Sequence, residues 1–255
     1  MALQLIDAIT DGTRRVLTRT GVVLLALLFA QQLLLVTSLN TLIAAEVPPE
    51  AADVIGLSLP VSGTVAGAIL LGAFLFTAVY FVILARAFAR PMTRLSSFPT
   101  ELYTRRIGRA TLTMLVGGIV VFLAIMIGFV LFFIPGLFLA VCFLFVIFTV
   151  GVEDRGVLSA LKRSWSLSKG NRLRLAVIVV FSGISGSLIG AVPALFQVAG
   201  ASTIGDLVSV LLNSILFTFI YGVTASAYLQ LAEDDGDRGD PNVVAATSSG
   251  TAPEV

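Results

Sequence analysis

Residues 110–152 read ATLTMLVGGIVVFLAIMIGFVLFFIPGLFLAVCFLFVIFTVGV, which is 43 positions without a charged side chain. As one helix rising about 1.5 Å per residue, this stretch would be roughly 65 Å long, whereas the hydrocarbon core of a bilayer is about 30 Å thick. Within it lies Ile134-Pro135-Gly136, where a proline without a backbone donor stands beside a glycine, and this favours a turn. We therefore predict a helical hairpin with arms at 110–133 and 137–152.

Four other stretches have the same character. Each holds 25 residues without a charge, and about 20 are enough to cross the hydrocarbon; they are residues 21–45, 61–85, 175–199 and 207–231. The chain is 57% hydrophobic and 12% charged, with a mean hydropathy of +1.02, whereas soluble domains are about 25% charged. The sequence predicts an all-α fold: a polytopic transmembrane helical bundle of six spans, arranged as three hairpins within residues 21–231.

Positive charge is concentrated in three segments outside the spans. Fifteen of the sixteen Lys and Arg residues lie at 14–19, 86–109 and 155–174, whereas the alternate connections hold Glu46, Glu50, Asp53 and Asp206 and no basic residue. The positive-inside rule then places both termini in the cytoplasm of a multi-pass protein of the cell (plasma) membrane. A cleaved signal peptide is the alternative for the N-terminus. It is disfavoured because the first apolar run exceeds the usual 7–15 residues.

Short amphipathic segments are predicted at the cytoplasmic surface. Residues 1–20 and 157–169 have apolar side chains at near-helical spacing, and the second segment includes the only tryptophan, Trp165, followed by Gly170 as a helix end. A third, weaker candidate follows Pro99. Each segment precedes two spans, so we expect three copies of one unit. Residues 232–255 are rich in Asp, Gly, Ser and Thr, which predicts a disordered acidic tail.

Small and polar residues within the spans indicate how the helices pack. The spacings Gly63-xxx-Gly67 and Gly186-xxx-Gly190 favour close helix approach, within one chain or between two, and Pro193 predicts a kink. The polar residues of the spans fit either interhelical hydrogen bonds or a polar cavity; they are Gln31, Gln32, Asn40, Tyr80, Gln197, Asn213 and Tyr221.

Little in the sequence indicates chemistry. There is no histidine, and the one cysteine, Cys142, lies in an apolar run, so disulfide frameworks and Cys/His metal sites are excluded by count and no cofactor is expected. The spans lack ionisable Asp, Glu, Lys and Arg, which mark proton relays and ion-coupled transport. Glu153 and Asp154 could hold a divalent ion at the headgroups, but pairing with Arg155 or Lys162 is favoured. We predict no catalytic residue and no enzyme.

The basic connectors suggest contact with lipid. Clusters of Arg and Lys near a leaflet attract anionic lipid by about 1 kcal/mol per charge, although the same clusters also orient the protein. The candidate headgroup contacts are Arg105, Arg106, Arg109, Lys162, Arg163, Trp165, Lys169 and Arg172. Binding of nucleic acid is disfavoured because the charges are divided among three membrane-tethered segments.

Three quoted segments resemble a known family. FFIPGLFLA (132–140), EDRGVLSALKRSW (153–165) and SKGN (168–171) resemble the membrane domain of some glycerophosphoryl diester phosphodiesterases and related stand-alone families of bacteria and haloarchaea. The resemblance implies a six-span layout with an amphipathic helix after an Ile-Pro-Gly turn. The phosphodiesterase activity of those proteins belongs to a separate soluble barrel with histidine ligands, which this chain lacks, so no catalytic residue is carried over.

These observations favour a non-enzymatic integral membrane protein with a structural or accessory role, acting through lipid headgroups or a partner membrane protein. A permease or membrane subunit of a transport system is the first alternative, and it would need a polar cavity lined by residues such as Gln31, Gln32, Asn213 and Tyr221. A lipid-acting enzyme at the cytoplasmic interface, using Glu153 and Asp154, is the second. Fourteen Arg against two Lys, with an Asp-rich tail, indicate a salt-adapted or GC-rich prokaryote, such as an archaeon.

Overall fold

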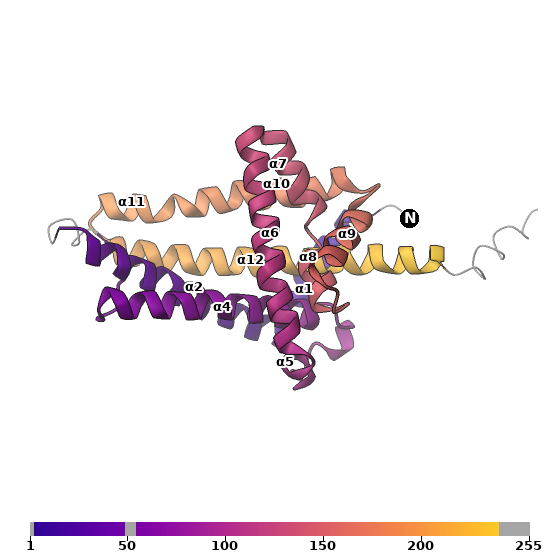
Figure 1. The fold of residues 1–255 in the computed structure, drawn as a ribbon, viewed down its shortest axis with the longest axis horizontal. Coiled ribbons are helices and arrows are strands. Elements are labelled where there is room, and N and C mark those ends of the chain that lie inside the picture. Colours follow the sequence, from indigo (N-terminus) through magenta and orange to yellow (C-terminus); the bar gives the residue numbers. More distant parts are fainter. Residues whose placement is uncertain (1–2, 49–54, 240–255) are drawn as a thin grey trace, which may run out of the picture.

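The computed structural model describes residues 3–48 and 55–239, and within these ranges the chain is built from helices joined by short turns (Figure 1). Six helices or helix pairs are long and apolar enough to cross a membrane: Arg19–Glu46, Gly63–Phe88, Ile107–Leu131, Phe133–Gly151, Arg172–Val198 and Ser202–Gly236. The predicted all-α helical bundle of a multi-pass membrane protein is confirmed.

Four of the six predicted spans are single helices, namely α2 (Arg19–Glu46), α4 (Gly63–Phe88), α6 (Ile107–Leu131) and α12 (Ser202–Gly239). The other two are each divided into two helices: α7 (Phe133–Cys142) with α8 (Val146–Gly151), and α10 (Arg172–Gly190) with α11 (Val192–Val198). Pro193 lies in the first turn of α11, so the chain breaks where a kink was predicted.

The turn of the α6–α7 hairpin lies earlier than predicted. Phe132 is the extended residue between the two helices, with φ −159° and ψ 147°, whereas Pro135 is already inside α7. A proline is accommodated there because the first N–H groups of a helix have no intrahelical partner. Gly128 and Gly136 let the arms meet: a Cβ on Gly128 would lie 2.8 Å from the Gly136 Cα atom.

A short helix precedes each pair of long ones, as the expected three-unit pattern requires. These are α1 (Leu5–Val16), α5 (Glu101–Thr104), which follows the 3₁₀ turn η1 (Met92–Arg94), and α9 (Val157–Ser168). Gly170 has φ +89°, in keeping with its predicted place at a helix end. α1 is more than a surface helix, because Gly12 packs so closely on α12 that an added Cβ would lie 2.5 Å from the Val223 backbone nitrogen.

The predicted boundary of the acidic tail is wrong for its first residues. α12 continues through 232–239 as regular helix, and Asp235 accepts a hydrogen bond from Arg163 of α9, which ties this extension to the bundle. The remainder of the predicted tail, 240–255, lies outside the described residues.

The buried core is concentrated at one end of the bundle. It is formed by the first turns of α2 and α10, the last turns of α4 and α12, and parts of α1, α7, α8 and α9 that lie between them. We call this the basic end, because the basic segments at 86–109 and 155–174 lie there. The opposite end is held by a polar contact, in which the Asp206 carboxylate accepts bonds of 2.8 Å from the Asn40 side chain and the Leu57 N–H.

Of the two Gly-xxx-Gly spacings, one lies against a neighbouring helix and the other does not. Gly63 lies against α2, where its Cβ would be 2.9 Å from the Ala45 Cβ, so this spacing serves packing within the chain. Gly186 and Gly190 have no atom within 4 Å of an added Cβ among the described residues, so the expectation of close packing within the chain is wrong for them.

The long helices do not all run in one direction. In Figure 1, α2, α4, α10 and α12 extend along the long axis of the molecule, whereas α6 and α7 run crosswise to them near the basic end. α6 packs on α4, and α7 packs on α10.

Candidate lipid-headgroup surface

Four of the eight predicted headgroup contacts are free to meet lipid. Arg106 and Arg109, at the start of α6, and Lys162 and Lys169, on and just after α9, are exposed, and none forms an ion pair with another described residue. Arg106 has φ 44°, a left-handed conformation that ends the preceding turn and starts α6. All four lie at the basic end.

The other four predicted contacts are engaged within the protein. The Arg105 guanidinium lies 2.6 Å from the Asp154 carboxylate, and Arg163 bonds to Glu153 at 3.4 Å and to Asp235. The Arg172 guanidinium lies over the Trp165 ring, 5.0 Å from its centroid. The structure therefore divides the predicted set into four residues without an ion pair among the described residues and four that form an ion pair or a ring contact, of which Arg105 and Trp165 are also exposed.

The adjacent acids Glu153 and Asp154 are also paired. Glu153 accepts hydrogen bonds from Arg155 and, at 2.8 Å, from the Tyr228 hydroxyl. Burial alone would raise the pKa of Glu153, but these hydrogen bonds and the charges of Arg163 and Arg155 together lower it below its ordinary value. The predicted pairing with Arg155 is present, while Arg163 replaces Lys162 as its second basic partner.

No group of three metal-ligating side chains occurs in the described ranges 3–48 and 55–239. Asp154 has φ 51°, a conformation uncommon for a residue other than glycine. Its carboxylate faces the guanidinium groups of Arg86 and Arg105, at 2.9 Å and 2.6 Å. The arrangement pairs the Asp154 charge with two arginines.

Two arginines of the basic segments are buried, which sequence reasoning missed. Arg86 donates from Nε to the Gly151 carbonyl at 2.8 Å and from Nη1 to the Arg105 carbonyl at 2.7 Å, in addition to its Asp154 pair. Arg15 donates to the Phe88 and Arg90 carbonyls at 2.6 and 2.7 Å, and so caps the C-terminal end of α4. Arg86 directly follows the apolar stretch 61–85, whereas Arg15 lies six residues before the stretch 21–45, so position in the sequence gave no common signal for their burial.

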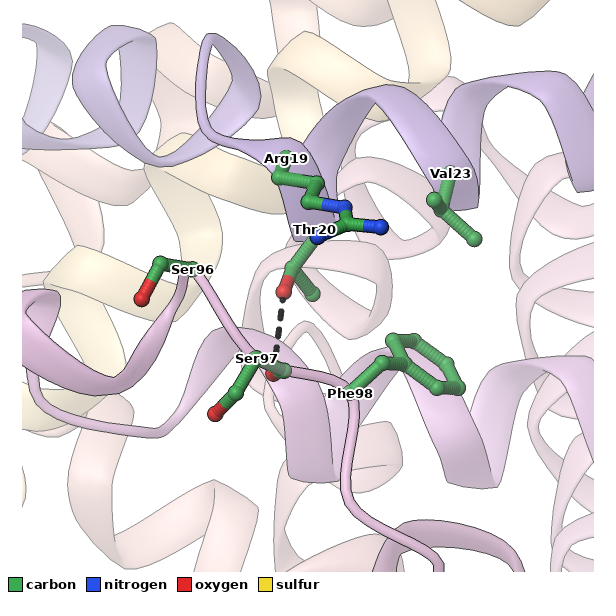
Figure 2. Close-up of a pocket in the computed structure, with 6 residues that line it drawn as sticks. All are labelled: Arg19, Thr20, Val23, Ser96, Ser97 and Phe98. Carbon is green, nitrogen blue, oxygen red and sulfur yellow. Dashed lines mark hydrogen bonds between the residues drawn. The ribbon is translucent and has the colours of Figure 1, made fainter.

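A further cavity lies beside the first turn of α2. It has a volume of about 410 Å³ and is lined by Arg19, Thr20, Val23, Ser96, Ser97 and Phe98. Figure 2 shows the Arg19 side chain reaching over Thr20 toward the space between Val23 and Phe98. The Thr20 hydroxyl donates to the Leu95 carbonyl at 2.6 Å, which holds the 96–98 segment against α2.

Arg19 is the unpaired charge of this cavity. Its side chain is exposed and forms no hydrogen bond or ion pair with another described residue. The apolar side chains of Val23 and Phe98 lie on the side toward which its guanidinium points, whereas the Ser96 and Ser97 hydroxyls point away from it in Figure 2. The Ser97 hydroxyl instead donates to the Arg94 carbonyl at 3.3 Å and accepts from Arg90 at 3.2 Å. A cation beside an apolar wall matches the chemistry of a phosphate ester attached to acyl chains. Sequence reasoning missed this site because 75 residues separate its two halves.

The polar residues Gln31 and Tyr221 of the spans lie in different surroundings. The Gln31 amide donates to the Ala73 carbonyl at 2.5 Å and to the Thr77 hydroxyl at 2.9 Å, so it links α2 to α4. Tyr221 borders a cavity of about 380 Å³ in which Thr77 is the only other polar lining residue. Hydrogen bonding between helices explains Gln31 without a transport path.

Comparison with curated proteins and with solved structures finds no match. A family model described as "Domain of unknown function (DUF7847)" matches residues 3–231. That range begins just before α1 and ends within α12, and it includes the whole basic end. The chain therefore belongs to the DUF7847 family, whose description assigns no activity.

Proposed function

We propose that this protein is a non-enzymatic, structural or accessory component of the membrane that binds anionic lipid headgroups at its basic end. The observation that supports this most is the cavity of Figure 2, where the unpaired Arg19 lies beside the apolar side chains of Val23 and Phe98. A phosphate oxygen placed there would gain a charge-assisted hydrogen bond, while the acyl chains would continue along Val23. The resemblance to the phosphodiesterase membrane domains is compatible with such a lipid-facing role.

The exposed cations support the same proposal. Arg106, Arg109, Lys162 and Lys169 would add an attraction of about 1 kcal/mol per charge to a leaflet rich in anionic lipid. The positive-inside rule gives this leaflet as the cytoplasmic one, with both termini on that side.

Catalysis and transport are less well supported. Glu153 and Asp154, the candidate pair for a lipid-acting enzyme, are each occupied by two basic side chains. A permease would need Gln31 and Tyr221 to face one wet cavity, whereas Gln31 bonds to α4 and Tyr221 borders an apolar cavity. Neither arrangement offers a ready substrate position.

Removing the Arg19 charge should weaken binding of anionic lipid selectively. The purified chain in mild detergent is titrated with phosphatidylglycerol, and the rise in thermal midpoint gives the apparent affinity relative to phosphatidylcholine. Arg19→Gln should weaken phosphatidylglycerol binding about fivefold, because one charge near a headgroup contributes about 1 kcal/mol. Phosphatidylcholine should act equally on both proteins.

The matched control is Arg14→Gln, which removes an exposed charge from α1 at the same end of the bundle. It should leave the affinity within twofold of the original. Equal losses in the two variants would show general charge attraction and contradict a defined site at Arg19. Inorganic phosphate tested at equal concentration separates the sources of the anion: if it protects as well as the lipid does, the cavity binds free phosphate and the lipid proposal fails.

A further inference from the structure

We propose that the α6–α7 hairpin does not cross the bilayer but lies within the leaflet at the basic end, where the acyl chains of that leaflet cover it. This inference goes beyond headgroup binding and does not depend on it. The hairpin is long enough to span the bilayer, but α6 and α7 run crosswise to the other long helices (Figure 1).

The contacts of Phe138 give the first argument. Phe138 lies on α7 five residues after its first residue, and its ring is 4.8 Å from the Arg172 guanidinium carbon and 5.5 Å from the Trp165 ring. Arg172 is the first residue of α10, and Trp165 belongs to α9, so both lie at the basic end. The start of α7 is therefore at the membrane level where α10 begins.

The length of helix between Phe138 and the turn gives the second argument. Five residues of helix rise about 7.5 Å, whereas a crossing requires about 30 Å. If α7 crossed the bilayer, Phe138 would lie near the far headgroups and could not contact Arg172. The hairpin turn at Phe132 thus lies within about one and a half helical turns of a charged residue at the basic end.

The rest of the returning arm stays at the same level. The Cys142 carbonyl accepts a 2.8 Å hydrogen bond from Ser164 of α9, and the Phe145 N–H donates to the same hydroxyl at 3.2 Å. After α8, Glu153 bonds to Tyr228 in the last turns of α12. From Phe138 to Glu153 the returning arm therefore lies at the basic end, and no part of it lies at the opposite end of the bundle.

The two halves of α6 differ in how much of their surface is buried. Its first half packs on α4, where Ala110 and Met114 are buried. Its far half and the turn project from the bundle, so that Val130, Leu131, Phe132, Phe133 and Ile134 are between 64% and 80% exposed. Figure 1 shows the same arrangement, with α6 and α7 crosswise to the other long helices.

The chemistry of this projection identifies its partner. The uncharged stretch from 110 to 152 could not remain in water with five consecutive large apolar side chains exposed, and the hairpin begins next to the basic residues Arg105, Arg106 and Arg109. Acyl chains at the level of the spans match that surface. The charge pattern is compatible with this placement, because a hairpin that returns within one leaflet leaves both basic segments on the same side, as a spanning hairpin does.

The experiment compares three exposed apolar positions, each changed to cysteine and labelled with bimane: Ile134→Cys at the hairpin, Leu173→Cys at the basic end and Val198→Cys at the opposite end, which are 77%, 88% and 91% exposed. The original chain controls for reaction of the buried Cys142. Each labelled protein is reconstituted, and a nitroxide lysolipid is added from outside, so that it enters the outer leaflet of the vesicle alone. Vesicles of both insertion directions are separated by an affinity tag at the C-terminus.

In both vesicle populations, the fraction of bimane fluorescence that is quenched should be the same at positions 134 and 173. The quenched fraction at position 198 should differ from both by at least threefold. Nitroxide lipid mixed into both leaflets should quench all three positions. If position 134 follows position 198, the hairpin crosses the bilayer and the proposal is overturned. If position 134 is not quenched from either leaflet, protein covers the hairpin, as in a dimer of this chain, and the lipid partner is overturned.

Discussion

Replacing Arg86 by methionine should lower the thermal midpoint of the protein in mild detergent by on the order of 10 °C. The Arg86 side chain is buried and bonds to the Asp154 carboxylate and to the carbonyls of Gly151 and Arg105. Removing one partner of a buried ion pair costs about 3–5 kcal/mol because the other charge and the carbonyls lose their donor. Loss of helix measured by circular dichroism during heating checks the result.

The control for this substitution is Arg105→Met. Arg105 bonds to the same carboxylate, but its side chain is 64% exposed, so its loss should cost less than about 1 kcal/mol. Equal shifts in the two variants, or no shift for Arg86→Met, would contradict a structural role for the buried guanidinium. Such a result would leave Arg86 as one more orienting charge.

Adding a single methyl group at Gly12 should detach α1 from the bundle. In Gly12→Ala the new Cβ would lie 2.5 Å from the Val223 nitrogen and 2.8 Å from the Gly222 carbonyl carbon, and these backbone atoms of α12 cannot yield as a flexible side chain would. Overpacking of this kind typically costs about 1–3 kcal/mol. We expect cleavage after Arg14 by trypsin, under native conditions in detergent, to become at least tenfold faster.

Gly186→Ala makes the same chemical change where no atom of the described chain lies within 4 Å. It should leave the rate of cleavage at Arg14 unchanged and the thermal midpoint equal or slightly higher, because alanine favours helix over glycine. If Gly12→Ala is as resistant to trypsin as Gly186→Ala, α1 does not depend on its close contact with α12.

The long uncharged stretches were predictable because span length and hydropathy are local properties. The 25-residue limits at 21–45 and 61–85 each fall within three residues of the ends of α2 and α4. The helix from 157 and its end before Gly170 were also predictable from local sequence. Amphipathic spacing indicates a helix, and a glycine that can adopt a left-handed conformation indicates where it ends.

Contacts between distant segments were not predictable. Arg15 and Arg86 have the same sequence context as exposed arginines, and burial by α4, α5 and α8 alone distinguishes them. The cavity at Arg19 depends on a turn 75 residues away. Gly12 and Gly222 lack the Gly-xxx-Gly spacing that drew attention to Gly186, where no described atom lies within 4 Å of an added Cβ.

The direction of the α6–α7 hairpin could not be predicted from the sequence either. Composition and the positive-inside rule describe a spanning hairpin and a hairpin that returns within one leaflet identically, since both begin and end on the same side. The shortness of the second arm, 137–152, was the one local indication. The direction of the hairpin is inferred from the contacts of Phe138 with Arg172 and Trp165, which the charge pattern does not reveal.

Sided labelling of two cysteine variants on intact cells tests most directly whether the basic end faces the cytoplasm of a bilayer-embedded bundle. Val61→Cys lies just before α4 at the opposite end, and Lys162→Cys lies on the exposed face of α9. A membrane-impermeant maleimide should modify position 61 on intact cells, and position 162 only after the cells are permeabilised. Modification of position 162 from outside, with position 61 protected, would contradict the arrangement.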